Sequence, residues 1–290
     1  AGDGRLAVSD DGRHVAFASA ATNLVAGDTN GRVDVFVNDR DADGNAIFDE
    51  PGGIRTVRVS VASDGTQAKG DSLAANMSSD GRYVVFQSEA KNLVPDDTND
   101  ATDIFLHDRD ADGDGIFDEA GPDGTSTERI NVTSTGVQAE RETGSEVPFV
   151  SDDGRYVAFW STAALVPGGD EFGGLQDGFV RDRREGTTAV VTLNSADGDG
   201  VGNAGILGMS RDGRYVSLGG IAQNLVPNGP PVGGPAVYVR DLVASATAIA
   251  SYDPAATRAN QLAAGGMALS GDGRFVGFYT DDAMVASDTN

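Results

Sequence analysis

The sequence predicts an all-β repeat protein, and three observations carry this prediction. First, a Ser-x-Asp-Gly-Arg motif followed by an apolar run occurs five times in the 290 residues, beginning at Ser9, Ser78, Ser151, Ser210 and Ser270. Such regularly recurring units bury their faces by stacking on one another. Second, short runs of β-branched and aromatic residues alternate with Gly, Asp and Asn clusters, as strands alternate with turns. Third, helical periodicity is sustained nowhere, and the 40 glycines would each cost a helix about 1 kcal/mol.

Each unit contains four predicted strands, which is the composition of a β-propeller blade. In the second unit we expect them at residues 73–77, 83–88, 103–107 and 128–133. The Asp-Gly pair between the first two strands predicts a tight hairpin, because glycine supplies the positive φ that such a turn requires. The fold class predicted is therefore an all-β propeller of four-stranded blades, with four full repeats and a two-stranded half repeat.

The repeats place the blades at about 6–61, 73–134, 147–194 and 205–251, with a half blade at 266–290. No linker interrupts them, so we expect one domain over residues 1–290. The fifth unit stops at Asp288-Thr289-Asn290, where the first two units continue into a third strand. Either the chain is a fragment of a longer protein, or the last blade is completed by other means, such as a second copy of the chain. A two-stranded edge is a template for pairing.

The composition narrows the class of partner. The formal charge of -24 and the pI of about 4.2 disfavour nucleic acids and anionic membrane surfaces and favour metal cations or basic partners. The chain has no cysteine, which excludes disulfides, thiol catalysis and zinc-thiolate sites. No apolar run has the length of a membrane span. The residues that begin the chain do not form a signal peptide.

The repeat resembles a known family. The run Ser-x-Asp-Gly-Arg-Tyr-Val-Ala-Phe at residues 151–159, with the segments 34–40 and 92–99, is similar to the TolB-like β-propeller repeat family, and the similarity covers essentially the whole chain. The resemblance implies a propeller fold and a bacterial protein that is secreted, on the cell surface or periplasmic. Propellers of this kind serve as interaction platforms, peptidase accessory domains and lyase scaffolds, so the resemblance does not choose among these functions.

Two twelve-residue segments, 39–50 and 108–119, predict calcium sites. Each has acidic residues at positions 1, 3 and 5, Gly at 6 and Glu at 12, which is the ligand pattern of an EF-hand loop. The expected ligands are Asp39, Asp41, Asp43, Asn45 and Glu50 in the first segment, and Asp108, Asp110, Asp112, Asp114 and Glu119 in the second. No helices flank these loops, and Asp49 or Asp118 could replace the glutamate at position 12. The alternative interpretation is a solvated hairpin tip.

A second pattern, Asp-x-Asn-x-x-x-Asp, precedes the third strand of two units. It comprises Asp28, Asn30 and Asp34 in the first, and Asp97, Asn99 and Asp103 in the second. These side chains could bind another cation or form Asx-turns that satisfy local backbone groups. A third, Gly-rich candidate at Asp197, Asp199 and Asn203 is expected to be a flexible turn.

The sequence gives little support to catalysis. His14 replaces the Tyr or Phe of other repeats, which predicts strand packing, and His107 replaces Asn38 and Arg181 at a strand end. No Gly-x-Ser-x-Gly elbow or Gly-Lys-Ser/Thr phosphate loop occurs. Trp160, the only tryptophan, is expected to pack between blades, with a sugar-stacking platform as the alternative. The five motif arginines are expected to pair with acids.

These observations favour a non-catalytic, calcium-binding propeller scaffold outside the cytoplasm, at an extracellular, cell-surface or periplasmic location. Its expected partner is another protein, a glycan or further copies of itself. The alternatives are a hydrolase or lyase that acts on polysaccharide, since paired carboxylates suit glycoside chemistry, and an accessory domain of a larger enzyme.

Overall fold

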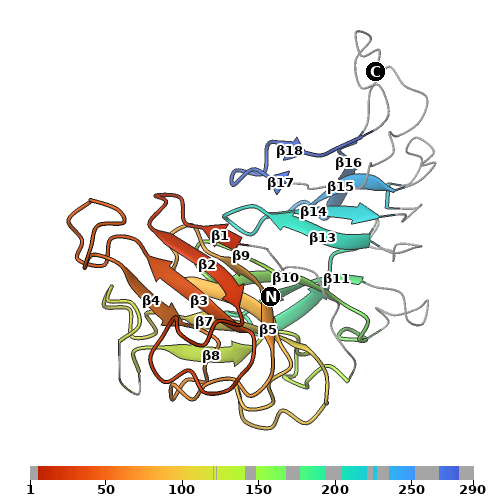
Figure 1. Cartoon of the computed structure of the whole chain (residues 1–290). Helices are drawn as coiled ribbons and strands as arrows, with labels where there is room; N and C mark the ends of the chain where they lie inside the picture. The colour runs from red at the N-terminus through yellow and green to blue at the C-terminus, as the bar shows by residue number, and fades with distance from the viewer. Residues whose placement is uncertain are drawn as a thin grey trace.

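The computed structural model describes residues 6–119, 121, 123–140, 148–167, 177–193, 204–220, 225–226, 235–251 and 268–280. Within these ranges every regular element is a strand, and the strands form four antiparallel four-stranded sheets and one two-stranded sheet (Figure 1). The all-β fold class and the arrangement of four blades and a half repeat are therefore confirmed.

Each sheet is one blade whose strands follow chain order. Blade 1 contains β1 (Leu6–Val8), β2 (His14–Ser19), β3 (Asp34–Asp39) and β4 (Arg55–Arg58). Blade 2 contains β5 (Ser72–Met77), β6 (Tyr83–Ser88), β7 (Asp103–Asp108) and β8 (Ser126–Arg129). Blade 3 contains β9 (Phe149–Val150), β10 (Tyr156–Ser161), β11 (Asp177–Asp182) and β12 (Thr187–Val190). Blade 4 contains β13 (Ala204–Met209), β14 (Tyr215–Gly220), β15 (Ala236–Asp241) and β16 (Ala246–Ile249), and the half repeat contains β17 (Ala268–Leu269) and β18 (Val276–Gly277).

The repeated motif forms the hairpin between the first two strands of each blade. In blade 1, Ser9 Oγ donates a hydrogen bond of 2.6 Å to Asp11 and accepts one from the backbone N–H of His14, while Asp11 accepts one from the N–H of Arg13. Gly12 has a φ of 74°, which the tight turn requires. The same bonds recur in the other four copies. The motif is thus conserved within the chain because it closes each hairpin.

The motif arginine ties this hairpin to the end of the third strand. Four arginines donate paired hydrogen bonds to the aspartate at that strand end, and the pairs are Arg13–Asp39, Arg82–Asp108, Arg155–Asp182 and Arg214–Asp241. Paired bonds from a guanidinium to a carboxylate fix geometry as well as adding energy. The expectation that these arginines pair with acids is confirmed for these four blades.

Side-chain and backbone hydrogen bonds join neighbouring blades. A threonine of the outermost strand donates its hydroxyl hydrogen to a carbonyl of the preceding blade in three places, from Thr127 to Val61, from Thr188 to Val132 and from Thr247 to Leu193. Near the inner strands, the N–H of Asp10 donates to Ser79 and the N–H of Asp152 donates to Arg211. The blades are therefore linked at both their inner and their outer edges.

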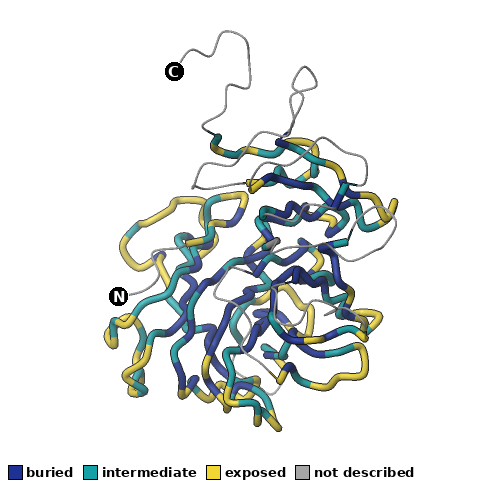
Figure 2. Tube along the Cα trace, turned by 90° about the vertical axis from the view of Figure 1, so that its right-hand side faces the viewer, coloured by how far each residue is buried: buried dark blue, intermediate teal, exposed yellow. Residues whose placement is uncertain are grey.

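The hydrophobic core lies between blades rather than within them. Figure 2 shows which segments of the chain are buried. Three clusters of buried apolar side chains fill the junctions of blades 1 and 2, 2 and 3, and 3 and 4. The third contains Trp160, which is 7% exposed, together with Tyr238 and Leu218 of blade 4. The prediction that Trp160 packs between blades is confirmed, and its burial leaves no ring face for sugar stacking.

One predicted strand is displaced. The strand expected at 83–88 coincides with β6, whereas β8 begins two residues before and ends four residues before the strand expected at 128–133. The apolar run continues beyond β8 because Ile130 packs in the core between blades 2 and 3, and Thr133 N–H then bonds to Val137 in a local turn. The apolar residues that follow Arg129 therefore belong to the core between blades and do not extend the strand. Of the half blade, residues 281–290 lie outside the described residues.

Candidate metal centre in the blade hairpins

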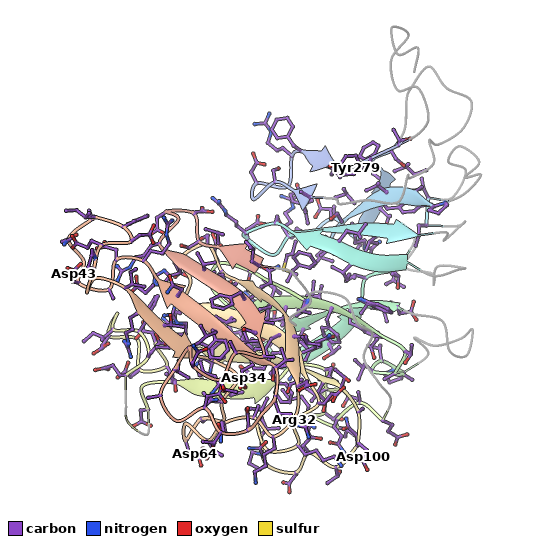
Figure 3. The ribbon with its side chains drawn as sticks, viewed as in Figure 1. Arg32, Asp34, Asp43, Asp64, Asp100 and Tyr279 are labelled. Atoms are coloured by element: carbon purple, nitrogen blue, oxygen red, sulfur yellow. The ribbon has the colours of Figure 1, made fainter. Side chains whose placement is uncertain are left out.

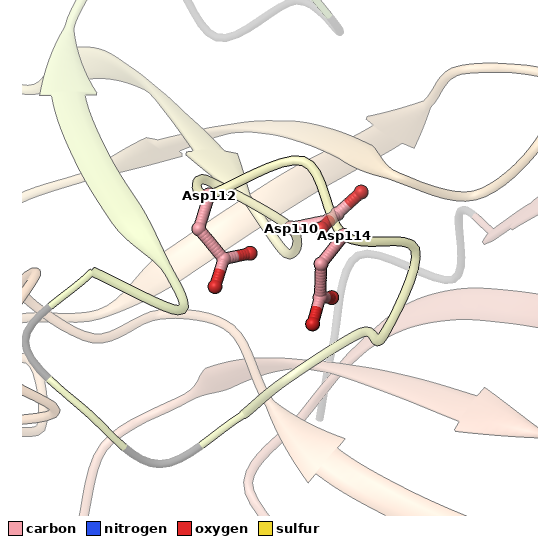
Figure 4. A group of neighbouring side chains, drawn as sticks. All are labelled: Asp110, Asp112 and Asp114. Atoms are coloured by element: carbon pink, nitrogen blue, oxygen red, sulfur yellow. The ribbon is translucent and has the colours of Figure 1, made fainter.

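Three aspartates converge on the hairpin that connects β7 and β8. Carboxylate oxygens of Asp110, Asp112 and Asp114 lie within 4.8 Å of one another (Figure 4). Asp110 is buried, at 4% exposure, whereas the other two are exposed to solvent. Among the residues that the structure describes, this is the one group of three or more acidic or imidazole side chains that could hold a metal ion. The loop thus offers a hard cation at least three oxygen ligands on one side.

Local backbone geometry brings the three carboxylates together. Gly113 and Gly115 have φ values of 76° and 88°, which allow the chain to turn twice within three residues. Asp110 accepts a hydrogen bond of 3.2 Å from the N–H of Gly115, and Asp114 accepts one of 2.8 Å from the N–H of Ile116. The alternation of Asp with a small residue therefore folds the loop around its own carboxylates.

The end of the loop is fixed by a buried arginine. Arg109, which is 1% exposed, donates two hydrogen bonds to Asp118, at 2.8 and 2.6 Å, and one of 2.8 Å to the carbonyl of Gly81. Its guanidinium also lies 4.9 Å from the centre of the Phe117 ring. Both carboxylate oxygens of Asp118 therefore accept hydrogen bonds from Arg109. At the end of the loop, Glu119 is the acid that remains available to a cation.

The charges of the three aspartates affect the pKa of Glu119. Its pKa is raised above the usual value, first by the negative charge of Asp114, then by desolvation and by the charges of Asp112 and Asp110. A raised pKa of this kind arises when like charges lie near the titrating group. A bound divalent cation would remove the repulsion, so the electrostatics of the loop favour cation binding.

The corresponding loop of blade 1 is built similarly but is less acidic. Asp41 accepts hydrogen bonds from the N–H groups of Asn45 and Ala46, as Asp110 does from Gly115 in blade 2. The side-chain amide of Asn45 donates to Asp43, at 3.0 Å, and to Glu50. Figure 3 shows Asp43 at the outer tip of this connection. An amide donor thus partly satisfies the oxygens that a cation would use, which makes this loop the weaker candidate.

Asp39 and Asp108, the expected ligands at position 1, have another partner in the structure. Both are held by paired hydrogen bonds from Arg13 and Arg82. Burial would raise the pKa of Asp39, but the hydrogen bonds from Arg13 and from the N–H of Asp41 hold that pKa below its usual range. The oxygens that the structure brings together begin two residues after Asp108, at Asp110.

The second pattern surrounds an arginine. Asp28 and Asp34 both face the guanidinium of Arg58, with Nη1 3.1 and 3.3 Å from their carboxylate oxygens, and Asn30 donates to Asp34 at 2.9 Å. Arg129 plays the same part between Asp97 and Asp103, and Asn99 donates to Asp103. All four aspartate side chains are almost fully buried. In both blades the cation between the two carboxylates is therefore a guanidinium.

Both histidines are buried. His14 is 5% exposed and packs against Gly81 of the next blade, as strand packing predicts. His107 is 2% exposed, its Nδ1 lies 2.9 Å from the hydroxyl of Thr127, and burial lowers its pKa to about 4. Neither side chain has the solvent access that a general acid or base acting on an external substrate needs. The candidate at Asp197, Asp199 and Asn203 lies outside the described residues.

The blade 2 loop also packs on blade 1. The ring centres of Phe117 and His14 are 5.6 Å apart, and the side chain of Arg55 donates a 3.2 Å hydrogen bond to the carbonyl of Asp118. A cavity of about 370 Å³ lies at this contact and is lined by residues of both blades. A cation that orders the loop would therefore also strengthen the junction between the two blades.

Several solved structures are similar to this chain in fold. TolB from Acinetobacter baumannii is 14% identical with a TM-score of 0.45, and the match covers 93% of this chain and 47% of that one. A putative TolB from Agrobacterium tumefaciens is 11% identical with a TM-score of 0.43, over 86% and 61%. The β-propeller domain of the Trilobed protease from Pyrococcus furiosus is 8% identical with a TM-score of 0.40, over 81% and 52%. The chain thus spans roughly half of the length of these proteins.

Comparisons of sequence give no further assignment. No family model matches the chain, and no curated protein is significantly similar to it in sequence. The fold and the acidic hairpin therefore define its class, an all-β propeller repeat with a candidate cation loop. The described residues also contain no helix that is long and apolar enough to span a membrane.

Proposed function

We propose that the chain is a non-catalytic β-propeller scaffold whose β7–β8 hairpin binds calcium. The observation that carries the proposal is the convergence of Asp110, Asp112 and Asp114 within 4.8 Å, with Glu119 close enough for its pKa to respond to their charges. We infer a setting outside the cytoplasm, at an extracellular, cell-surface or periplasmic location, where calcium is abundant.

Calcium suits this loop better than magnesium does. Calcium accepts six to eight oxygen ligands in a flexible arrangement, whereas magnesium demands a nearly ideal octahedron and dehydrates reluctantly. The exposed Asp112 and Asp114 can adjust to a larger ion, and the charge of -24 favours a cation at long range.

Calcium would act as a structural ion. An ion that binds only the folded protein stabilises it by about 2.7 kcal/mol when its concentration is a hundred times its dissociation constant. Because the loop contacts blade 1 through Phe117 and Asp118, this stabilisation would extend to the junction of blades 1 and 2.

A scaffold fits the distribution of polar groups better than an enzyme does. The acidic cluster lies on the β7–β8 hairpin rather than among the inner strands, and both histidines are buried. We therefore propose that the protein acts through its surfaces, by binding another protein or a glycan or by self-association. Sedimentation velocity over micromolar concentrations tests self-association: a single monomeric species throughout would limit the partners to other molecules.

The calcium proposal is tested by titration of the metal-free chain. We expect calorimetry to detect a calcium site and thermal unfolding to show a calcium-dependent rise in Tm that magnesium does not reproduce. Asp112→Asn and Asp114→Asn should each weaken calcium binding at least tenfold, since each removes a ligand charge without changing shape. Asp123→Asn, an exposed aspartate beyond the loop, is the matched control. Equal binding by all three variants, or no binding at millimolar calcium, would reduce the loop to a solvated turn.

A further inference from the structure

An arginine recurs beside the hairpin glycine in three of the blades. In blades 1 to 3 the residue after the paired aspartate of the third strand is Arg40, Arg109 or Arg183. Each donates from Nη1 to the carbonyl of the hairpin glycine in its own blade, at 2.8 Å to Gly12, 2.8 Å to Gly81 and 2.5 Å to Gly154. The position therefore has one structural task, which is to bring a guanidinium to that carbonyl.

The cleft between blades 2 and 3 shows what surrounds this guanidinium. Arg183 lies 5.5 Å from the ring centre of Tyr83 in the preceding blade. It also donates to Glu128 on β8, the outermost strand of that blade, at 2.5 Å. A ring, a glycine carbonyl and a carboxylate thus form the binding site, which offers stacking, a hydrogen-bond acceptor and a countercharge to a planar cation.

The cleft between blades 3 and 4 has the same walls without the arginine. Leu242 occupies the position of Arg183, because its N–H bonds to the carbonyl of Arg214 at 2.9 Å as the N–H of Arg183 bonds to Arg155 at 2.8 Å. Ala189 occupies the position of Glu128, since Ala189 pairs with Val180 on the neighbouring strand as Glu128 pairs with Leu106. Both charged members of the site are therefore replaced by apolar residues.

These replacements leave a cavity of about 470 Å³. Its lining includes the ring-bearing Tyr156 and Gly213, which correspond to Tyr83 and Gly154, as well as Ala189 and Leu242. In the described part of the chain no side chain donates to the carbonyl of Gly213, although Gly12, Gly81 and Gly154 each accept an arginine. The site for the guanidinium is present, but the chain does not supply the guanidinium.

We propose that this cleft binds an arginine side chain from a basic segment of a partner protein. The apolar surfaces of Leu242 and Ala189 would cover the methylenes of the incoming arginine, and its guanidinium would reach Gly213 beside the Tyr156 ring. Asp212 contributes negative charge at the cavity wall, whereas Asp182, which also lines the cavity, is paired with Arg155 at 2.7 Å. Of the two arginines that also line the cavity, Arg214 is paired with Asp241 at 2.7 Å and Arg240 donates to Thr247 and Leu193. The charge of -24 attracts a basic partner.

As a partner surface the cleft rests on the scaffold role proposed above, but the arginine site can be tested without a partner and without calcium. The probes are three blocked tripeptides, acetyl-Gly-Arg-Gly-amide and its Lys and Leu counterparts, titrated by NMR or calorimetry in chelator. We expect the arginine peptide to bind the wild-type chain at one site, and more tightly than the other two. Binding of the arginine peptide with no effect of calcium would support the cleft independently of the cation loop.

Two substitutions test the location. Leu242→Arg supplies the internal arginine, so we expect it to weaken binding of the peptide at least tenfold, whereas Ala189→Glu restores the missing carboxylate and should strengthen binding about tenfold, which is the scale of one charge-assisted hydrogen bond. Arg183→Leu is the matched control in the cleft between blades 2 and 3. Because Glu128 and Gly154 remain there, it should raise the number of peptides bound from one to two.

The inference would be overturned by either of two results. One is binding of the arginine and leucine peptides with equal affinity by the wild-type chain. The other is unchanged binding in both Leu242→Arg and Ala189→Glu, with circular dichroism showing that the variants are folded. Failure of the calcium titration alone would leave the cleft unaffected, so the two proposals fail separately.

Discussion

The ring of Tyr83 lies against Gly154 of the following blade, so closely that a Cβ on this glycine would come within 2.5 Å of the tyrosine Cζ. Gly154 also has a φ of 65°, in the left-handed region. The same contact joins three further pairs of neighbouring blades, between His14 and Gly81, Tyr156 and Gly213, and Tyr215 and Gly273. The glycine of the repeated motif therefore serves both the turn of its own blade and the packing of the blade before it.

Gly154→Ala should destabilise the protein by about 3 kcal/mol. The added methyl group would overlap the Tyr83 ring, at a cost of roughly 1–3 kcal/mol, and an alanine in the left-handed region costs a further 1–2 kcal/mol or so. Urea unfolding followed by circular dichroism measures the loss.

Gly31→Ala separates the two costs. Gly31 has a φ of 63°, and a Cβ built on it meets no atom within 4 Å. Only the backbone cost remains, so the expected loss is about 1 kcal/mol. If Gly31→Ala and Gly154→Ala were equally unstable, the contact between ring and glycine would not limit the packing of the blades.

Arg58→Met tests what lies between Asp28 and Asp34. Removal of the guanidinium leaves two buried carboxylates without their shared countercharge, and breaking a buried ion pair in this way costs about 3–5 kcal/mol. We expect a loss of this size in urea unfolding that added calcium does not restore. Recovery of the lost stability by calcium would instead support a metal site at these aspartates.

Arg55→Met is the matched control for Arg58→Met. Arg55 is exposed and donates one hydrogen bond of 3.2 Å to the carbonyl of Asp118. Exposed polar contacts contribute little to stability, so this variant should remain within about 1 kcal/mol of the wild type.

The repeat and its strands could be predicted from the sequence because they follow from local patterns. The Asp-Gly hairpins and the alternation of strand residues depend only on residues that are close together in the sequence. The strand β6 accordingly lies where it was expected. The partners of Asp39 and Asp108 could not be predicted in this way. Asp39 and Asp108 match position 1 of an EF-hand, yet their partners are Arg13 and Arg82, each 26 residues away in the chain. A signal was present, because Asp182 and Asp241 hold the same repeat position without a loop.

The buried clusters of the second pattern show the same limit. From the sequence, Asp28, Asn30 and Asp34 could be either metal ligands or turn residues. Arg58 decides which cation they face, and it comes from β4, a strand that pairs with β3 only in the folded blade. The spacing of residues along the chain identifies the acidic side chains, but it does not identify the cation that the folded structure places beside them.

Asp241→Asn should remove part of the acid sensitivity of the protein. The hydrogen bonds from Arg214 lower the pKa of Asp241 to about 2. An acid whose folded pKa is depressed stabilises the protein above its unfolded pKa of about 3.9, and this contribution is lost as the pH falls toward 2. We expect the variant to be less stable than the wild type at pH 7 and to approach it at pH 2. Parallel stability curves from pH 5 to pH 2 would contradict the assignment.

His107→Asn should remove a second pH dependence, at higher pH. Thr127 donates its only hydroxyl hydrogen to the carbonyl of Val61, at 2.6 Å, so it accepts a hydrogen bond from Nδ1–H of His107. Burial lowers the pKa of His107 to about 4, so the folded state excludes a proton that the unfolded chain binds below about pH 6.5. Stability should therefore fall between pH 6.5 and pH 4, by up to about 3 kcal/mol.

Asparagine is the appropriate replacement because blade 1 already contains it. Asn38 donates to Thr56 at 3.0 Å in the equivalent place, so His107→Asn keeps the donor to Thr127 and removes the titration. We expect urea unfolding of the variant to be nearly independent of pH between 6.5 and 4.5, apart from the smaller contribution of His14, whose pKa is lowered by burial and then by the charge of Arg109. A variant that lost stability as steeply as the wild type over this range would show that His107 is not the group that titrates.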